Sequence, residues 1–252
     1  MSQVKFDNDL GRVDRNSAGV EINPFDLNAL EAAVRIKETS NGHIIVISMG
    51  PLSAESSLKD ALARGADEAV LLSDSAFSGS DTMATSYVLA AAIKKLSDYD
   101  LIICGEKTVD GDTGQVGSEI AEHLGIPHIS YVSAIKEISP KLVVSYEMNN
   151  IRYTVESGFP VLITVTKDIN NPRLPAFSDK MKARRADIQK WTCADLIPDI
   201  TPDRTGVQGS PTRVYRVTVP LDDERKGRMF RDSLEDAVKE VVTIIENQVK
   251  LK

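Results

Sequence analysis

The sequence predicts an α/β protein built on a doubly wound, mostly parallel sheet, with an antiparallel hairpin region and a C-terminal arm that ends in a helix. Apolar runs of strand length alternate with amphipathic helical stretches through residues 24–125, as in a parallel sheet covered by helices. Short β-type runs follow one another over residues 129–166. Prolines then interrupt the chain repeatedly between residues 170 and 221, so few long elements are expected there.

In the first half of the chain, each expected helix carries an apolar stripe with helical spacing. The stripes are Leu27, Leu30 and Val34 after Pro24; Leu58, Ala61 and Leu62, closed by Gly65; Ala84, Val88, Ala91 and Ala92, capped by Asp81; and Val116, Ile120 and Leu124, closed by Gly125. Buried strands are expected between them at residues 43–48, 69–72 and 101–104. In a doubly wound sheet, ligands bind at the carboxyl ends of the strands.

The second half departs from this alternation. Antiparallel hairpins or a meander are expected over residues 130–138, 141–148, 151–156 and 161–166, with turns at Ser139-Pro140 and Asn149-Asn150. Residues 170–221 should be mostly extended chain. A final helix is expected with the apolar stripe Leu234, Val238, Val241, Val242, Ile245 and Val249, which needs a surface to cover on this domain or on another subunit. We place a nucleotide-binding domain at residues 1–190 and the arm at residues 191–252.

Composition excludes several classes of function. The net charge of -7 and the pI of about 5.1 argue against sequence-independent nucleic-acid binding and against an anionic membrane surface. Neither the cysteines (Cys104 and Cys193) nor the histidines (His43, His123 and His128) cluster as metal ligands. No apolar stretch approaches the ~20 residues of a membrane helix, and the first residues are no signal peptide, so a soluble, cytoplasmic protein is expected. No pattern typical of acid–base or nucleophilic catalysis is visible, so no catalytic residue is expected.

The segment most informative for function follows the strand expected at residues 101–104. Glycines at positions 105, 111, 114 and 117 surround Asp110, Asp112 and Thr113, and a helix follows. A glycine-flanked helix N-terminus at the carboxyl end of a parallel strand binds anions, because its free N–H groups and the positive end of its dipole face the ligand. Taken alone, the pattern fits an ordinary βα-turn equally well.

The residues between these glycines favour the binding site. The run VDGDTGQVG (109–117) resembles the nucleotide loop of the electron transfer flavoprotein beta subunit, and residues 22–38, 48–51, 62–72 and 171–188 resemble further segments of that family in the same order. The resemblance implies a Rossmann-like, adenine-nucleotide-binding fold. It implies that the phosphates of FAD or AMP are held by Asp110, Thr113, Gly114, Gln115, Val116 and Gly117, with Asn23, Ser48, Met49 and Gly50 near the adenosine or ribityl part. Valine at position 114 or 117 should then release the nucleotide and leave the fold intact.

A second polar run, residues 79–87, stands at another expected helix start. Ser, Asp and Thr are common capping residues, but DTMATSY (81–87) also resembles electron-bifurcating members of the family, in which beta binds FAD in place of AMP. Thr82 and Thr85 are therefore candidate flavin or pyrophosphate contacts. The resemblance then implies hydride transfer from NADH, with one electron passing through the alpha-subunit FAD to an FAD-containing dehydrogenase of the acyl-CoA or 2-hydroxy acid type. The other electron would pass to ferredoxin or flavodoxin.

Two alternatives stay open at this point. A non-bifurcating electron transfer flavoprotein beta subunit would bind structural AMP. A regulatory ATP-binding module of the universal stress type would share the parallel-sheet architecture, although this chain lacks the usual order of its glycine motifs. A flavin absorbing near ~450 nm in complex with an alpha subunit would favour the flavoprotein interpretation.

The resemblance also locates two contacts with other proteins. The C-terminal arm is expected to reach over an alpha subunit. The segment 171–185 is expected to be an exposed loop, opened by its prolines, that docks on the dehydrogenase through an anchor at Phe177, with Arg173, Met181 and Lys182 nearby. An aromatic anchor surrounded by polar residues is typical of interface hot spots.

The N-terminus lacks a segment that the resemblance leads us to expect. Members of the family normally begin with an apolar strand before the part that matches residues 3–15, whereas Met1-Ser2 leads directly into that part here. In the doubly wound order this strand is central. We therefore expect either a longer natural product or weakened flavin occupancy.

Overall fold

The computed structural model describes residues 6–7, 12–13, 20–213 and 233–249. The chain divides into two units, one containing residues 13–215 and one containing residues 216–252. They are described separately below. The short strands β1 (Phe6–Asp7) and β2 (Arg12–Val13) form a two-stranded sheet. The strand expected ahead of residue 3 lies outside the described residues.

A three-stranded parallel sheet occupies one part of the α/β unit. Its order is β10 (Gln189–Trp191), β4 (Glu68–Leu72) and β3 (Ile45–Met49). Ile47 of β3 and Gln189 of β10 both lie in register with Val70 of β4. The last strand of the sheet therefore comes from a distant part of the chain, which the local sequence pattern did not predict.

A five-stranded mixed sheet forms the rest of the unit, in the order β5 (Leu101–Gly105), β9 (Val161–Val165), β6 (His128–Glu137), β7 (Leu142–Met148) and β8 (Ile151–Ser157). β6, β7 and β8 are antiparallel, as predicted. The antiparallel expectation was wrong for β9, which pairs in parallel with both β5 and β6. Because β9 is buried throughout, its continuous apolar run is that of a central parallel strand.

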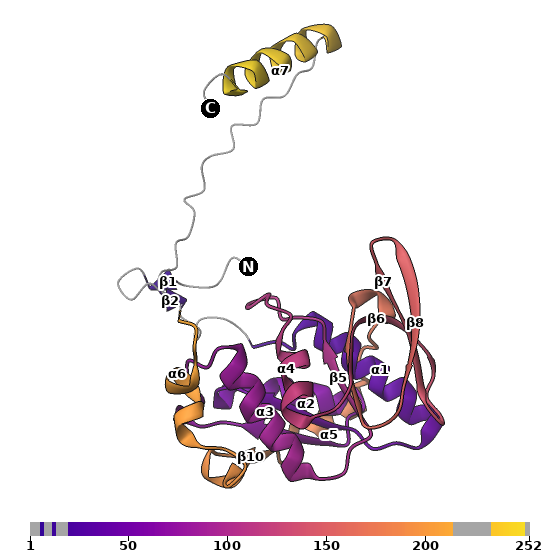
Figure 1. The fold of residues 1–252 in the computed structure, drawn as a ribbon, viewed down its shortest axis with the longest axis vertical. Helices are drawn as coiled ribbons and strands as arrows, with labels where there is room; N and C mark the ends of the chain where they lie inside the picture. The colour runs from indigo at the N-terminus through magenta and orange to yellow at the C-terminus, as the bar shows by residue number, and fades with distance from the viewer. Residues whose placement is uncertain (1–5, 8–11, 14–19, 214–232, 250–252) are drawn as a thin grey trace. The chain divides into compact units, whose positions relative to one another are not determined.

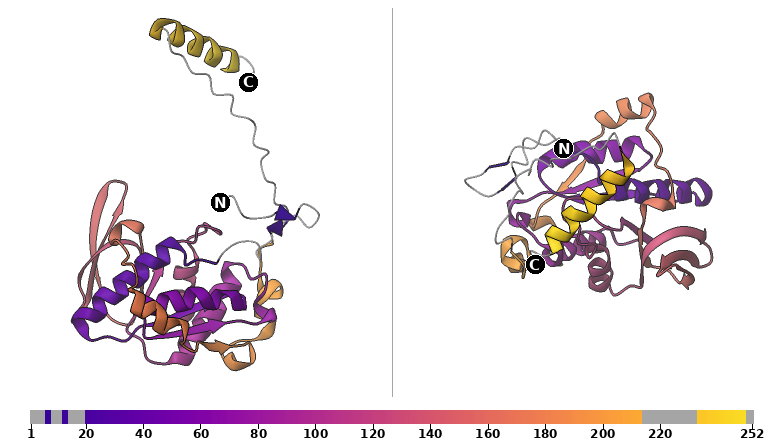
Figure 2. Two further views of the ribbon diagram at one scale, coloured as in Figure 1. Left: turned by 180° about the vertical axis from the view of Figure 1, so that it is seen from behind. Right: turned by 90° about the horizontal axis from the view of Figure 1, so that it is seen from above.

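Four helices come from the alternating half of the chain: α1 (Pro24–Ser40), α2 (Glu55–Ala63), α3 (Thr82–Leu96) and α4 (Val116–Leu124). Figure 1 and Figure 2 show these helices packed around the strands of the α/β unit. Leu30 of α1 packs in a cluster with Val46 of β3, and Ala29 packs with Leu101 of β5. One helix therefore covers parts of both sheets, and the predicted α/β fold is confirmed.

The two strands that pack against α1, β3 and β5, are less buried than the strands beside them. Within the described part of the chain, β3 and β5 each pair with a strand on one side only. Both are half-buried along their whole length, whereas β9, paired on both sides, is fully buried. For these three strands, burial follows the number of paired neighbours.

The chain after residue 166 is more structured than predicted. It contains the 3₁₀ turns η4 (Lys167–Ile169), η5 (Ala194–Leu196) and η6 (Pro202–Arg204) and the helices α5 (Phe177–Arg184) and α6 (Gly206–Gly209); two further 3₁₀ turns, η2 (Leu52–Ala54) and η3 (Ser75–Phe77), lie earlier in the chain. The expectation of an open loop was wrong for residues 177–184. The prolines precede α5, and Asp179 in its first turn and Arg184 in its last complement the helix dipole.

Part of the expected arm belongs to the α/β unit. Cys193, Leu196 and Ile200 are buried in a cluster with Val70 and Val88, so the chain continues to pack on the sheet beyond residue 190. Their apolar spacing was hidden by the surrounding prolines.

The second unit contains the predicted C-terminal helix, α7 (Leu234–Val249). Its apolar stripe is exposed in this single chain, with 83% of Leu234, 54% of Val238 and 54% of Ile245 accessible. An exposed stripe of this length is typical of a protein–protein interface. In the described residues, no helix is long and apolar enough to cross a membrane.

Candidate functional site

The loop between β5 and α4 has two residues in the left-handed region, Asp112 at φ 52° and Gly114 at φ 64°. Left-handed residues turn successive backbone N–H groups toward one side, which creates a concave site for an anion. Gly105 at the end of β5 is also required, because a Cβ there would lie 2.7 Å from the Phe25 backbone. The loop therefore starts where the first turn of α1 lies close to the end of β5.

The N-terminus of α4 has no side-chain cap. The first N–H groups of any helix have no intrahelical acceptor. Gln115, at the capping position of α4, makes no side-chain hydrogen bond to them. Thr113 and Gln115 are exposed, while Gly114 and Val116 are half-buried. Open donors beside a left-handed turn fit the phosphates of a dinucleotide or mononucleotide.

Asn23 links this loop to α1. Its Nδ2 donates to the Lys107 carbonyl at 2.8 Å, and its Oδ1 accepts from the Val109 N–H at 3.2 Å. Its amide therefore fixes the loop backbone, although sequence reasoning gave it a place near the nucleotide only. The carboxyl of Asp110 accepts from the Gly111 N–H at 2.8 Å, within its own turn.

Gly117 has a role that differs from the prediction. A Cβ at this position would lie 2.6 Å from Thr164 Cγ2 on β9 and 3.9 Å from Cys104. Gly117 is buried and permits close packing of helix on sheet. This contact argues against the expectation that Gly117→Val would leave the fold intact, because a neighbouring side chain would have to shift.

The second polar run is organised differently. The Asp81 side chain caps α3, accepting from the Ala84 N–H at 3.1 Å, and it also accepts from the N–H and hydroxyl of Thr212 at 2.9 and 2.8 Å. Thr82 donates to Glu119 of α4 at 3.1 Å, which brings the first turns of α3 and α4 together. Thr85 is half-buried one turn into α3.

Ser48, Met49 and Gly50 lie at the end of β3 and in the turn that follows. All three are half-buried, and the Gly50 N–H donates to the Leu72 carbonyl at 3.0 Å. The turn is therefore held by β4, at the carboxyl end of a strand, where ligands of α/β sheets bind.

Three residues of this region were missed by the sequence analysis. Asp26 accepts from the Gly105 N–H at 2.8 Å, and burial raises the pKa of its carboxyl. Lys107 forms an ion pair with Asp112 at 2.6 Å. Tyr131 is 51% exposed at a φ of 59°, and its hydroxyl would lie 3.6 Å from a Cβ on Gly114. Left-handed backbone in a bulky residue concentrates at functional sites, but no sequence pattern reveals it.

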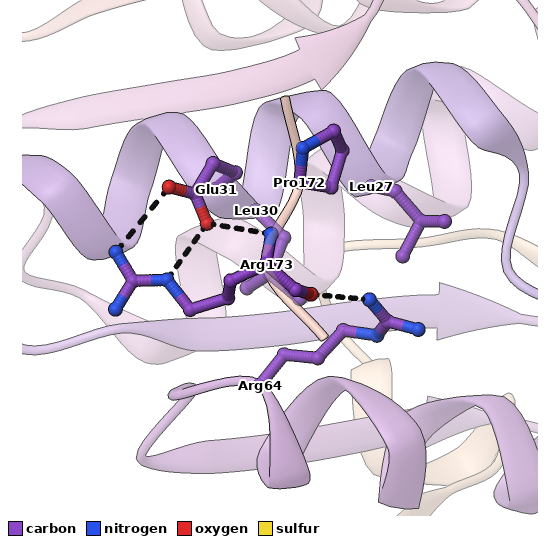
Figure 3. A pocket seen from close by; sticks show the side chains of 6 residues that line it. All are labelled: Leu27, Leu30, Glu31, Arg64, Pro172 and Arg173. Carbon is purple, nitrogen blue, oxygen red and sulfur yellow. Dashed lines mark hydrogen bonds and ion pairs between the residues drawn. The ribbon is translucent and has the colours of Figure 1, made fainter. Parts of the chain in front are cut away.

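The expected docking segment presents two apolar side chains. Leu174 is 87% exposed and Phe177 is 79% exposed. Met181 is half-buried, and Lys182 is exposed and 4.0 Å from Asp179. Arg173 instead turns toward α1, where it pairs with Glu31 (Figure 3). It also pairs with Glu38 of the same helix. Leu174 was not predicted as part of this surface.

Neither a reactive thiol at Cys104 nor a metal cluster in the part of the chain that the structure describes adds to this site. Burial, with a smaller contribution from Asp26, raises the pKa of the Cys104 thiol to about 12, so this thiol is inert at neutral pH. No group of three or more His, Cys, Asp or Glu side chains among the described residues could hold a metal ion.

Parallel strands covered by helices define a protein of the α/β class, and the uncapped helix N-terminus after β5 is its candidate anion site. The model of the electron transfer flavoprotein domain matches residues 11–196 of the chain. The chain therefore belongs to the electron transfer flavoprotein family, and its relatives place it among the beta subunits.

Three relatives illustrate the similarity. The chain is 40% identical to an electron transfer flavoprotein subunit beta of Thermoanaerobacterium thermosaccharolyticum over 96% of this chain and 92% of the relative. It is 42% identical to the caffeyl-CoA reductase-Etf complex subunit CarD of Acetobacterium woodii over 87% and 83% of the two chains. It is 38% identical to protein FixA of Bradyrhizobium diazoefficiens over 100% and 89%. Membership of this family replaces the universal-stress interpretation. A beta subunit of this family pairs with an alpha subunit.

Proposed function

We propose that this beta subunit binds FAD and belongs to the electron-bifurcating type. The observation that carries the nucleotide site is the uncapped N-terminus of α4 behind the left-handed turn at Asp112 and Gly114. When bound, FAD supplies the chemistry that accepts a hydride from NADH and releases its electrons singly, to a dehydrogenase through the alpha-subunit FAD and to ferredoxin or flavodoxin.

The chain's own residues bind and orient the nucleotide. The N–H groups of residues 113–117 hold the phosphates, and Asp110 shapes the turn that precedes them. Asn23 holds the loop against α1, and Ser48, Met49 and Gly50 line the neighbouring strand end. Thr82 and Thr85 are the contacts that distinguish FAD from AMP, and AMP in a non-bifurcating subunit is the second candidate.

The partners are an alpha subunit and an electron-transferring enzyme. The exposed stripe of α7 is the part of the arm that packs on the alpha subunit. The second partner is an FAD-containing dehydrogenase of the acyl-CoA or 2-hydroxy acid type. One relative is named as a subunit of a caffeyl-CoA reductase-Etf complex, which supports the acyl-CoA type. This enzyme docks on Leu174 and Phe177, with Met181 and Lys182 beside them.

The nucleotide site is tested by Gly114→Ala against Gly125→Ala in the heterodimer. Both glycines are left-handed, at φ 64° and 67°, but a Cβ on Gly114 would meet the Glu106 carbonyl at 3.3 Å, whereas Gly125 has open space. Each variant carries a similar backbone penalty of about 1–2 kcal/mol. We expect only Gly114→Ala to lose beta-bound nucleotide, measured by release and chromatography as FAD or AMP. Equal nucleotide content in the two variants would contradict the site.

The docking surface is tested by Phe177→Ala against Leu52→Ala, another exposed apolar residue at 64% accessibility. Truncating an interface anchor costs about 2 kcal/mol or more of binding. We expect Phe177→Ala to slow electron transfer with an acyl-CoA dehydrogenase while flavin reduction by NADH stays unchanged. The docking assignment fails if Phe177→Ala behaves like Leu52→Ala.

A further inference from the structure

We infer that Glu31 and Arg173 form a clamp that positions the docking surface without touching the partner, an inference that rests on the docking role proposed above. The clamp joins the middle of α1 to the segment just before Leu174 (Figure 3). Arg173 is then a positioning residue, although sequence resemblance grouped it with the docking contacts.

The carboxylate of Glu31 is the centre of the clamp. Its side chain is 4% exposed, and an ionised group so little exposed must be paired. Its Oε2 accepts from the backbone N–H of Arg173 at 3.2 Å and from Nε at 2.8 Å, and its Oε1 accepts from Nη2 at 3.3 Å. One carboxylate therefore fixes both the backbone and the guanidinium of the same residue.

The backbone around Arg173 is held from other directions as well. Arg64 of α2 donates through Nη1 to the Arg173 carbonyl at 2.7 Å, the bond drawn in Figure 3. Asn28 of α1 donates to the Asn170 carbonyl at 2.9 Å, and Asn170 donates back to the Asn28 carbonyl at 3.0 Å. Both polar groups of the Arg173 backbone are thus used, and the chain entering the segment is fixed three residues earlier.

The guanidinium of Arg173 has few donors left for a partner. Nη1 and Nη2 donate to the two carboxylate oxygens of Glu38 at 2.5 and 3.1 Å, in addition to the bonds with Glu31. Charged groups satisfied by two carboxylates gain little from a third acceptor. The side chain therefore acts inside this chain, on its own backbone.

The clamp lies directly before the two exposed residues of the docking surface, Leu174 and Phe177. Leu174 and Phe177 are the apolar residues that point into solvent, so no burial of their own fixes the segment. On the far side, the buried Ala183 secures α5. Holding the segment at both ends removes part of the ordering cost of binding, which is how preorganisation raises affinity.

The test uses Glu31→Gln in the full heterodimer, with an acyl-CoA dehydrogenase as the probe and a 2-hydroxy-acid dehydrogenase as the second probe. Gln keeps the size of the side chain but loses the charge that holds Arg173. We expect the KM for the dehydrogenase to rise about tenfold, the value for losing a charge-assisted bond, with kcat, nucleotide content and alpha-subunit pairing unchanged. Amide hydrogen exchange in residues 170–177 should accelerate in the absence of any dehydrogenase.

Two further variants keep the test decisive. Arg35→Gln removes the other ion pair of Glu31 without touching the segment, and it should leave the KM unchanged. Arg173→Lys keeps the charge but cannot bridge Glu31 and Glu38, so it should raise the KM even if Glu31→Gln fails to fold.

The double variant Glu31→Gln/Phe177→Ala separates the clamp from the docking assignment. If the clamp acts through the anchor, Glu31→Gln adds no further loss in the Phe177→Ala background. A full additional loss, or an unchanged KM with accelerated exchange, overturns the clamp while the docking surface stands. If Phe177→Ala alone has no effect, the docking assignment fails and the positioning role fails with it.

Discussion

The N-termini of α3 and α4 lie side by side, joined by the hydrogen bond from Thr82 to Glu119. They differ in capping: α3 has a closed terminus, capped by a side chain, and α4 has an open terminus without one. Asp81 closes α3 with its own carboxylate, whereas α4 begins at Gln115 without a side-chain cap. Both helices follow runs of Gly, Asp, Ser and Thr in the sequence. A similar polar run therefore leaves the backbone donors of a helix open in one case and occupied by the chain's own side chain in the other, and only the open donors fit the anion site proposed above.

The closed terminus is used for internal cohesion. Besides capping α3, Asp81 holds the backbone and hydroxyl of Thr212, so it attaches the last described residues of the α/β unit to the helix that it caps. The N-terminus of α4 has no side-chain cap, which leaves its donors to the nucleotide proposed above. The comparison predicts that changes at the Asp81 cap affect stability and that changes around the start of α4 affect nucleotide content.

The largest loss of stability is expected at Gly117, where the first turn of α4 packs on the sheet. Gly117→Val would drive a branched side chain into Thr164 Cγ2, which would lie only 2.6 Å from the Cβ of any residue larger than glycine at this position. Overpacking of a buried site costs about 1–3 kcal/mol or more. We expect a lower midpoint of thermal unfolding together with lost nucleotide. Gly111→Val is the control, since a Cβ there meets only the Thr108 hydroxyl, at 3.2 Å. Equal stability of the two variants would contradict the packing role.

The next effect concerns the closed terminus. Asp81→Ala removes the cap, which is worth about 0.5–2 kcal/mol, and should lower the unfolding free energy without changing the nucleotide content. Asp81→Asn should restore most of the stability, because Asn is a comparable cap. Loss of nucleotide in Asp81→Ala would show that Asp81 itself contributes to the binding site.

The pH dependence of the same variant follows from the carboxylate. Burial raises the pKa of Asp81, but the bonds from Thr212 and Ala84 outweigh it and hold the pKa below its ordinary value of 3.8. A carboxyl with a lowered folded pKa stabilises the fold above the unfolded pKa and loses this contribution as the pH falls through the folded value. We therefore expect the wild type and Asp81→Ala to differ in unfolding free energy at neutral pH and to converge below pH 3.8.

The sequence predicted the alternating helices and strands because each packs a regular apolar stripe, as α4 does with buried Ile120 and the partly buried Val116 and Leu124. It also located the loop around Gly114, since glycine spacing is a local property. It could not predict partners far apart in the chain. Arg173 meets Glu31 and Asn23 meets Val109 only after folding, and the charged or polar residue types alone do not specify the pair.

The smallest expected effect comes from giving α4 the cap that α3 already has. Gln115→Asp places a carboxylate at the capping position, where it can accept the free N–H groups and oppose the positive end of the helix dipole. We expect the nucleotide-free protein to gain a few tenths of a kcal/mol to about 1 kcal/mol in unfolding free energy. The same carboxylate repels phosphate, so nucleotide affinity should fall, and high salt should recover part of it. Titration of the nucleotide-depleted heterodimer with FAD and with AMP, at low and at high salt, measures the loss of affinity and its recovery.

Gln115→Asn is the neutral control, which caps without the charge. If Gln115→Asp binds as tightly as Gln115→Asn, the phosphates do not lie at this helix terminus, and the open end of α4 has another occupant.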